Sequence, residues 1–406
     1  MIIHRPLEEK ELKNVAKWTL VFGRRKTGKS FLIQEFIHYD EYFFVNRDRT
    51  ILSTGNGKEV QVDYATLVEI MKRALESGKT VVIDEFHRLD YKFLDYLHAM
   101  KKSGRLILLT STLFLAKKLL SEKSPLLGLF HEKQIYIIDL NDCISSLQHR
   151  RLDKRELLET AIMLREPINV AYFDSEKNIQ EGCAEVLKGS VNAVPALMGE
   201  IFLEEERGLS KIYESIVRAV ANGKVVSGEI SSSLFSKGLI PKDSPGTLQP
   251  YLATLVNIGL LKRIEVYGKN RFVYKVPSPL MRLFFYADEK YGISQRRMTD
   301  AEALRIVSGL MPRLVEDNVR EHLAYKFGLM EAIAESKDHE IDGLLMKFKR
   351  PEIAIEVKWG QKISSAEITR AEQVLGATNA KRKMLFVPDK TSVSSRALEI
   401  IDPEDL

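Results

Sequence analysis

Residues 23–30 contain the motif that most restricts how this chain can fold: Gly-Arg-Arg-Lys-Thr-Gly-Lys-Ser. The motif follows a short apolar run at 19–22 and opens a helical pattern at 29–37. Its glycines let backbone N–H groups turn inward around an anion, and the helix N-terminus adds partial positive charge. A strand, this loop and a helix in that order indicate a phosphate-binding P-loop within a layered α/β domain.

We therefore assign nucleotide binding to the whole loop, and the expected ligands are ATP and Mg²⁺. Lys29 should reach the β- and γ-phosphates, and Ser30 should be a ligand of Mg²⁺. The sequence leaves the choice between ATP and GTP open. The cofactor-binding residues expected in this motif are Gly23, Arg24, Arg25, Lys26, Thr27, Gly28, Lys29 and Ser30.

A second motif, Val-Val-Ile-Asp-Glu-Phe at 81–86, places two carboxylates at the end of an apolar strand. An unpaired carboxylate is costly to bury, so we expect Asp84 to meet a cation there and to hold Mg²⁺ beside Ser30. Glu85 is the expected catalytic residue, because a carboxylate in this place can orient or deprotonate the attacking water.

Two hydroxyl residues end the next expected strand, at 105–110. Ser111 is assigned to the nucleotide site, because either it or Thr112 could contact the γ-phosphate or the water. The other interpretation is that one of them N-caps a helix at 113–121.

The overall composition excludes several classes of protein. Hydrophobic residues make up 45% and charged residues 29% of the 406 residues, a balance typical of a globular protein. No apolar run approaches the ~20 residues of a membrane span, and Cys143 and Cys183 form no metal or disulfide pattern, so we expect a cytoplasmic protein with no membrane partner. A net charge of +5 permits a nucleic-acid partner without requiring one.

The hydrophobic pattern divides the chain into several segments. Short runs at 19–22, 42–45, 80–83, 105–110 and 134–140 resemble covered parallel strands and alternate with helical patterns, which predicts an α/β fold. The expected domains are a P-loop ATPase core at 1–141, a helical lid at 142–208, a winged helix at 209–278, a linking segment at 279–311 and a restriction-nuclease-like α/β domain at 312–406.

Five stretches of the sequence resemble the archaeal ATPase family, a P-loop branch near the AAA+ and STAND ATPases. The resemblance implies a central sheet in which the Asp84 strand lies beside other strands and not directly beside the P-loop strand. It also implies that the winged helix accompanies a C-terminal domain with a PD-(D/E)XK nuclease-like core. The stretches are Arg5 with Glu11-Leu12, LVFGRRKTGKS, YFFVNRDR, VVIDEFHRL and LLTST.

Two departures from the family pattern bear on hydrolysis. Members often read Ser-Pro-Leu-x-Gly-Arg where this chain reads Ser-Pro-Leu-Leu-Gly-Leu at 124–129, so a basic residue that could meet the γ-phosphate is absent at Leu129. The usual Gly-Gly-x-Pro of the lid is Asn-Ala-Val-Pro at 192–195. Another subunit of a homo-oligomer, or a protein partner, could supply the missing arginine.

The expected winged helix has its positive charge on the hairpin and none on the recognition helix. The helix at 246–259 contains no Lys or Arg, whereas the hairpin at 262–276 could contact DNA phosphates. The alternative is a winged helix used for packing or as part of the lid. The basic residues of the hairpin that could pair with phosphates are Lys262, Arg263, Lys269 and Arg271.

The C-terminal segment contains Asp342 in one expected strand, 339–346, and Glu356-Val357-Lys358 in the next, 353–359. Because strand side chains alternate, Glu356 and Lys358 share a face that Asp342 can join. This arrangement resembles the PD-(D/E)XK nucleases, in which the carboxylates bind Mg²⁺ and the lysine, here the catalytic Lys358, positions the water.

A preceding helix offers a further metal ligand, Glu321, with Glu316 as the weaker candidate. Two functions follow from the sequence. The first is a Mg-dependent ATPase acting on DNA, with a metal-dependent nuclease domain. The second is a nucleotide-switched interaction or signalling protein whose C-terminal domain no longer cuts and keeps Glu356 and Lys358 as a surface pair.

Overall fold

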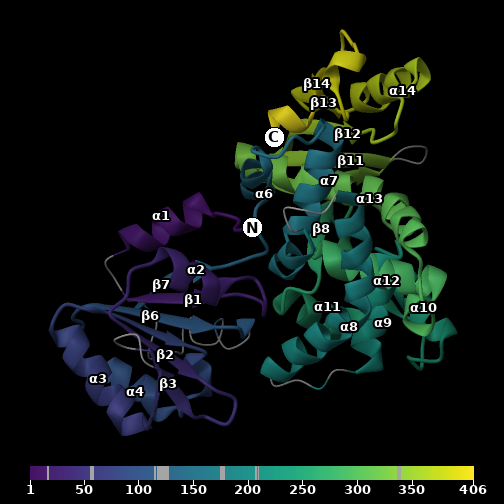
Figure 1. The fold of residues 1–406 in the computed structure, drawn as a ribbon. Coiled ribbons are helices and arrows are strands. Elements are labelled where there is room, and N and C mark those ends of the chain that lie inside the picture. Colours follow the sequence, from purple (N-terminus) through teal and green to yellow (C-terminus); the bar gives the residue numbers. More distant parts are fainter. Residues whose placement is uncertain are drawn as a thin grey trace.

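The computed structural model describes residues 1–15, 18–54, 59–113, 116, 128–173, 179–205, 208, 210–335 and 340–406. Two seven-stranded sheets organise these residues. In Figure 1 the P-loop part, drawn purple to blue, lies beside the helical part, drawn teal to green. The yellow C-terminal strands lie at the end of the helical part that carries the second sheet.

The first sheet has the order β4-β3-β2-β5-β6-β1-β7. The strand β6 therefore separates the Asp84 strand, β5, from the P-loop strand, β1, as the family resemblance implied. Strands β2, β5, β6, β1 and β7 are parallel, whereas β3 and β4 form an antiparallel edge. Their bounds are β1 Thr19–Phe22, β2 Glu41–Val45, β3 Ile51–Ser53, β4 Val60–Val62, β5 Thr80–Asp84, β6 Arg105–Thr110 and β7 His131–Gln134.

This sheet differs from the sequence prediction at both edges. The strand expected at 134–140 is wrong: β7 ends at Gln134, and Asp139 then caps the helix α6 (Leu140–Leu147) by accepting a hydrogen bond from the Asn141 backbone N–H. Strands β3 and β4 were not expected, because three-residue strands carry too little hydrophobic pattern.

Helix α3 (Tyr64–Glu76) illustrates how the helices of this part are fixed. Its apolar residues Leu67, Met71 and Leu75 recur at helical spacing and are buried, and Asp63 caps the first turn. Each such burial contributes about 1.5–3 kcal/mol. The other helices here are α1 (Pro6–Asn14), α2 (Lys29–Phe36) and α4 (Lys92–Ala99).

The segment 142–208, which was expected to be a lid and keeps that name below, contains no strand among its described residues. Its helices are the end of α6, α7 (Lys154–Leu164) and α8 (Ile179–Glu204). Helix α8 is the one described helix long and apolar enough to cross a membrane, by length and composition only; 44% of its apolar window is buried within the protein. It packs against α12 (Pro279–Tyr291) and α13 (Asp300–Phe327).

Three helices and a hairpin occupy the segment expected to be a winged helix. They are α9 (Lys211–Ala221), α10 (Ser227–Ser236), α11 (Pro245–Asn257), β8 (Lys262–Val266) and β9 (Phe272–Lys275). The segment 279–311, expected to be a linker, instead contains α12 and the first part of α13. Because α13 continues without a break through residues 311 and 312, the boundary that we predicted there is wrong.

The second sheet has the order β14-β13-β12-β11-β10-β8-β9. It includes the hairpin, because β8 pairs in parallel with β10, an arrangement that the sequence did not predict. The helix α14 (Ser365–Gly376) packs on β12 and β13. The remaining strands are β10 Met330–Glu335, β11 Glu340–Lys347, β12 Arg350–Val357, β13 Arg382–Phe386 and β14 Glu399–Ile401.

Candidate functional site

The P-loop makes a tight turn between β1 and α2. Lys26 and Gly28 have φ values of 63° and 86°, in the left-handed region that glycine adopts at least cost. At Gly23, a Cβ would lie 2.1 Å from the carbonyl oxygen of Ile135, so a side chain cannot be accommodated without moving the backbone. The first and sixth positions of the motif are therefore glycine for identifiable steric reasons.

The Lys29 side chain is buried inside this loop. Its Nζ donates hydrogen bonds of 3.0 Å to the backbone oxygens of Gly23 and Arg24. Burial lowers the pKa of Lys29 to about 8, although the nearby carboxylates of Glu85 and Asp84 oppose this shift. The ammonium is thus held at the loop, within electrostatic range of both expected acidic residues.

Asp84 ends β5 as a buried carboxylate. It accepts a 2.7 Å hydrogen bond from the hydroxyl of Tyr42, and a further one from Ser30. Burial raises the pKa of Asp84 despite these bonds and the nearby Lys29. The two residues expected to hold Mg²⁺, Ser30 and Asp84, are therefore in contact. Tyr42 could not be predicted as a partner of Asp84, because its strand, β2, pairs with β5 only in the folded sheet.

Glu85 leaves the strand in a left-handed conformation, with φ of 54°. One of its carboxylate oxygens accepts hydrogen bonds from Ser111, at 2.9 Å from Oγ and 3.3 Å from the backbone N–H. Ser111 therefore lies beside Glu85, and its expected contact with nucleotide stays a prediction. Thr112 contacts the hydroxyl of Thr110 at 2.9 Å. Most of the helix expected at 113–121 lies outside the described residues.

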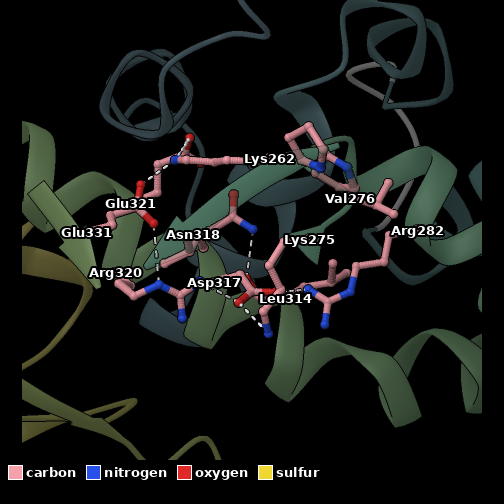
Figure 2. Close-up of a pocket in the computed structure, with 13 residues that line it drawn as sticks. Lys262, Lys275, Val276, Arg282, Leu314, Asp317, Asn318, Arg320, Glu321 and Glu331 are labelled. Carbon is pink, nitrogen blue, oxygen red and sulfur yellow. Dashed lines mark hydrogen bonds and ion pairs between the residues drawn. The ribbon is translucent and has the colours of Figure 1, made fainter. Parts of the chain in front are cut away.

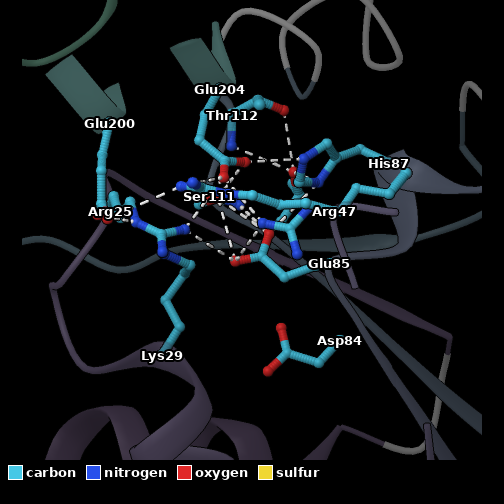
Figure 3. A network of polar contacts seen from close by, with 12 residues as sticks. Arg25, Lys29, Arg47, Asp84, Glu85, His87, Ser111, Thr112, Glu200 and Glu204 are labelled. Carbon is cyan, nitrogen blue, oxygen red and sulfur yellow. Dashed lines mark hydrogen bonds and ion pairs between the residues drawn. The ribbon is translucent and has the colours of Figure 1, made fainter. Parts of the chain in front are cut away.

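A carboxylate of the lid, Glu204, reaches the same place from the C-terminal end of α8, as Figure 3 shows. Burial alone would raise the pKa of Glu204, but His87 and Arg88 outweigh burial and lower it to about 2. Sequence reasoning missed Glu204 and both of these partners. Among the described residues, the side chains with a hydrogen bond or ion pair to its carboxylate include Arg25 (3.1 Å), Arg47 (3.6 Å), His87 (3.0 Å), Arg88 (2.8 Å) and Ser111 (3.2 Å).

The P-loop has two further tight contacts outside its own sheet. The Arg24 Nη2 donates to both carboxylate oxygens of Glu166, at 2.7 and 3.0 Å, and both side chains are buried. The Arg5 Nη2 donates to the backbone oxygen of Thr27 at 2.6 Å. Glu166 precedes a turn of 3₁₀ helix at Pro167–Tyr172, so the lid is joined to the loop from a second direction.

Glu85, His87 and Glu204 offer ligand atoms that all lie within 4.8 Å of one another. The surrounding charges disfavour a metal ion at this place. Arg25 and Arg88 each lie within 4.0 Å of both glutamates, and these arginines would repel a cation. The arginines around Glu204 are better suited to an anion.

The first sheet joins a P-loop strand to a strand that ends in an acidic pair. A comparison with protein families can test this combination. Residues 15–142 match the family model described as an AAA domain. The P-loop part of this chain is therefore similar to an AAA domain, and "the AAA domain" below means this part, residues 15–142. The match covers the first sheet and stops at the lid, so it supports a P-loop ATPase in general terms only.

Several solved structures have a remote likeness to the chain. The ORC2 protein of Aeropyrum pernix, in ADPNP–ADP complexes, is 11% identical with a TM-score of 0.41, over 76% of this chain and 94% of that one. The ORC1 protein of Aeropyrum pernix in complex with DNA is 14% identical with a TM-score of 0.31, over 72% and 94%. At these values we infer nothing about activity or partners. The chain has no match among curated proteins.

Away from the AAA domain, the expected C-terminal residues meet at neighbouring strands. The Lys358 Nζ donates a 2.8 Å hydrogen bond to Glu356 Oε2, while the buried Glu356 Oε1 has no partner. The backbone N–H of Val357 donates to Asp342 Oδ2 at 2.8 Å. Burial, and then the charge of Glu356, raise the pKa of Asp342 to about 6.

Of the two α13 glutamates considered as metal ligands, Glu321 and Glu316, the structure favours Glu316, the one that the sequence ranked lower. Glu321 is in ion pairs with Arg165, at 2.8 Å, and Lys262, at 3.0 Å, which corrects its expected role as a metal ligand. Glu316 instead lies near Asp342: burial, followed by repulsion from Asp342, raises the pKa of Glu316 to about 7. Glu316 is therefore the residue of α13 that joins the cluster.

Three of the four hairpin residues expected to contact DNA pair with carboxylates outside the hairpin. Lys262 is paired with Glu321 and Glu331 beside the small pocket in Figure 2. Both Lys269, at 3.1 Å, and Arg271 pair with Glu335 of β10. The remaining residue, Arg263, lies over the ring of Phe272, with 4.2 Å to its centroid. The side chains expected to contact DNA phosphates are thus largely occupied within the protein.

Proposed function

We propose that the AAA domain binds ATP with Mg²⁺ at its P-loop and hydrolyses it. The observation that carries the proposal is the convergence of Lys29, Asp84 and Glu85 at the carboxyl edge of one parallel sheet. Open α/β sheets bind their ligands at this edge. The arrangement gives phosphate-binding N–H groups, one buried ammonium and two carboxylates with different surroundings.

The residues present fit both ligands. Lys29 is charged for the most part at neutral pH, and exchanging its two carbonyl partners for phosphate oxygens would give a stronger, charge-assisted contact. The buried Asp84, whose pKa is raised, gains its charged form when a cation is near, and Ser30 is already in contact with it. Bound Mg²⁺ would neutralise charge on the phosphates.

Glu85 is the residue that we assign to the attacking water. It lies outside the strand, and its contact with Ser111 fixes the direction of the carboxylate. A carboxylate held in this way can accept a proton from water or orient the water in line with the γ-phosphate. Asp84 is suited to metal binding instead, because it stays in the strand and is bonded to Tyr42.

Calorimetric titration of the full chain with Mg-ATP tests the first part of this proposal. We expect Lys29→Ala to weaken binding by roughly tenfold or more, because it removes a charge-assisted contact. The control is Lys72→Ala, at an exposed lysine of α3. Equal affinities of the wild type and Lys29→Ala would refute the assignment of the P-loop.

We further propose that the C-terminal cluster is a metal-dependent nuclease site that acts on DNA. Glu316, Asp342, Glu356 and Lys358 lie on α13, β11 and the end of β12. The support is the buried Glu356 Oε1, which has no hydrogen-bond partner, beside two carboxyl groups that repel one another. A divalent cation would relieve both problems, since carboxylate oxygens are its preferred ligands.

The competing function is a nucleotide-switched interaction protein with a C-terminal domain that does not cut. The ion pairs of Lys262, Lys269 and Arg271 favour it in one respect, because they leave the hairpin little charge for DNA phosphates. Incubating the full chain with supercoiled plasmid and Mn²⁺, with and without ATP, separates the two functions. Nicking that disappears in Asp342→Ala supports the nuclease, and its absence in the wild type supports the interaction protein.

A further inference from the structure

The carboxylate of Glu204 occupies a pocket built from several strands of the AAA domain. Arg25 belongs to the P-loop after β1, His87 and Arg88 follow β5, and Ser111 follows β6. Each of these four side chains lies 2.8–3.2 Å from a carboxylate oxygen of Glu204. Figure 3 shows Glu204 entering this group from α8, on the side of the network away from Lys29 and Asp84.

The chemistry of this pocket is that of an oxyanion site. Two guanidinium groups, an imidazole and a hydroxyl converge on two oxygens, and forked arginine donors match carboxylate and phosphate equally well. Nothing in this set is specific for a glutamate of the same chain. A phosphoryl group has more oxygens and more charge, so it would use the same donors more fully.

The position of the pocket indicates which phosphate group of a nucleotide it would bind. Arg25 lies within the loop expected to hold the phosphates, and Ser111 Oγ lies 3.2 Å from Glu204 and 2.9 Å from the proposed catalytic Glu85. The pocket therefore adjoins both the phosphate loop and the residue assigned to the attacking water. The group that lies between these two in a bound nucleoside triphosphate is its terminal phosphate.

We propose that Arg25, His87, Arg88 and Ser111 form the binding site for the terminal phosphate of a nucleoside triphosphate, and that Glu204 occupies this site as an internal anion until nucleotide displaces it. The inference rests on the proposed binding of nucleotide by the P-loop. It assigns to Arg25 and Arg88 the positive charge that Leu129 does not supply. Because Glu204 is the last residue of α8, its displacement would also release the end of the lid.

The proposal predicts a difference between nucleotides with and without the terminal phosphate. We would measure the affinities of Mg-ADP and of a non-hydrolysable Mg-ATP analogue for the full chain by calorimetry. Glu204→Gln keeps the size of the side chain and removes its charge, so it should tighten the analogue by about tenfold and change ADP by less than about twofold. Arg88→Ala should weaken the analogue and not ADP, which gives a second reading if Glu204→Gln does not fold.

Glu200→Gln provides the matched control. Glu200 lies one turn earlier on α8 and contacts Arg25 and Arg47, but among its described contacts are none with His87, Arg88 or Ser111. This change should leave the ratio of the two affinities the same within about twofold. If both nucleotides bind and neither Glu204→Gln nor Arg88→Ala changes the ratio, the inference is wrong while nucleotide binding stands. If neither nucleotide binds to any variant or to the wild type, nucleotide binding itself is wrong, and this inference with it.

Discussion

The guanidinium of Arg24 in the P-loop and the carboxylate of Glu166 in the lid form an ion pair with hydrogen bonds of 2.7 and 3.0 Å, and both side chains are buried. Removing one partner leaves the other charge buried and unpaired, at a cost of about 3–5 kcal/mol. We expect Glu166→Gln to lower the free energy of unfolding by an amount near this range, measured by urea denaturation.

The double variant Arg24→Met with Glu166→Gln tests the cause of that loss. It removes the charge that Glu166→Gln leaves unpaired, so it should recover part of the stability. Losses that simply add in the double variant would show that the two side chains do not stabilise one another. The exposed pair Arg73–Glu69 on α3 is a control, since removing it should cost no more than about 0.5 kcal/mol.

Glu85→Gln should separate nucleotide binding from turnover. The amide keeps the shape of the side chain and loses its capacity to accept a proton, so steady-state hydrolysis should fall by about a hundredfold. Binding of Mg-ATP should remain, since Lys29, Ser30 and Asp84 are unchanged. Turnover equal to that of the wild type would mean that another residue activates the water.

Glu316 and Glu321 of α13 should differ in their effect on Mn²⁺ affinity. Glu316→Gln should weaken Mn²⁺ binding to the full chain by about tenfold or more, since it removes a carboxylate from the cluster with Asp342. Glu321→Gln, the matched change, should leave Mn²⁺ affinity unaltered because Glu321 contacts Arg165 and Lys262 instead. A loss of affinity in Glu321→Gln alone would restore the assignment made from the sequence.

Lys358 should be required for DNA cleavage and not for metal binding. Lys358→Ala is expected to bind Mn²⁺ as the wild type does and to lose plasmid nicking, since an ammonium positions water and does not ligate a cation. Nicking by Lys358→Ala at the rate of the wild type would leave the ion pair with Glu356 as its only role.

The ion pairs of Glu321 should also make the free energy of unfolding depend on pH. Burial raises its pKa, but Arg165 and Lys262 outweigh burial and lower the pKa to about 2, below the ordinary value of 4.5. A carboxyl group whose pKa is lowered by folding stabilises the protein at pH values above its ordinary pKa. This stabilisation is lost as the pH falls toward the pKa that the group has in the folded protein. The urea midpoint of the wild type should therefore fall more between pH 6 and pH 3 than that of Glu321→Gln. Parallel decreases would contradict the ion pairs.

The ion pairs of the hairpin argue against its expected role in DNA binding. Changing both Lys269 and Arg271 to Glu would remove phosphate contacts if these residues bound DNA, and the slope of affinity against salt would become shallower. Because both residues already pair with Glu335, we expect the salt slope to stay the same and the stability to fall. A shallower slope in a folded variant would identify the hairpin as a DNA contact.

The sequence predicts those parts of the site that lie in continuous motifs. Lys29, Ser30, Asp84 and Glu85 could be placed because the strand, loop and helix that hold them are local. Glu204 could not be placed, because it meets His87 only through the packing of α8 on the AAA domain, 117 residues along the chain. An acidic residue at the end of an apolar helix is ordinarily solvated, so the pattern contained no signal.

The choice between Glu316 and Glu321 shows a second limit. Both lie on α13, and five residues on a helix change the direction of a side chain by about 140°. The sequence indicates a helix there but not which side faces β11. The parallel pairing of β8 with β10 was equally hidden, because pairing between strands distant in the sequence leaves no periodicity in either one.

The pairing of β8 with β10 limits where the C-terminal half of this protein can be cut into separate fragments. A fragment that starts at 312 would cut α13 in two and leave the edge of β10 without the strand that covers it. The hairpin and the strands of the candidate nuclease site should therefore exchange amide hydrogens as one cooperative unit. Recombination that transfers the cluster to another chain would have to carry the hairpin with it.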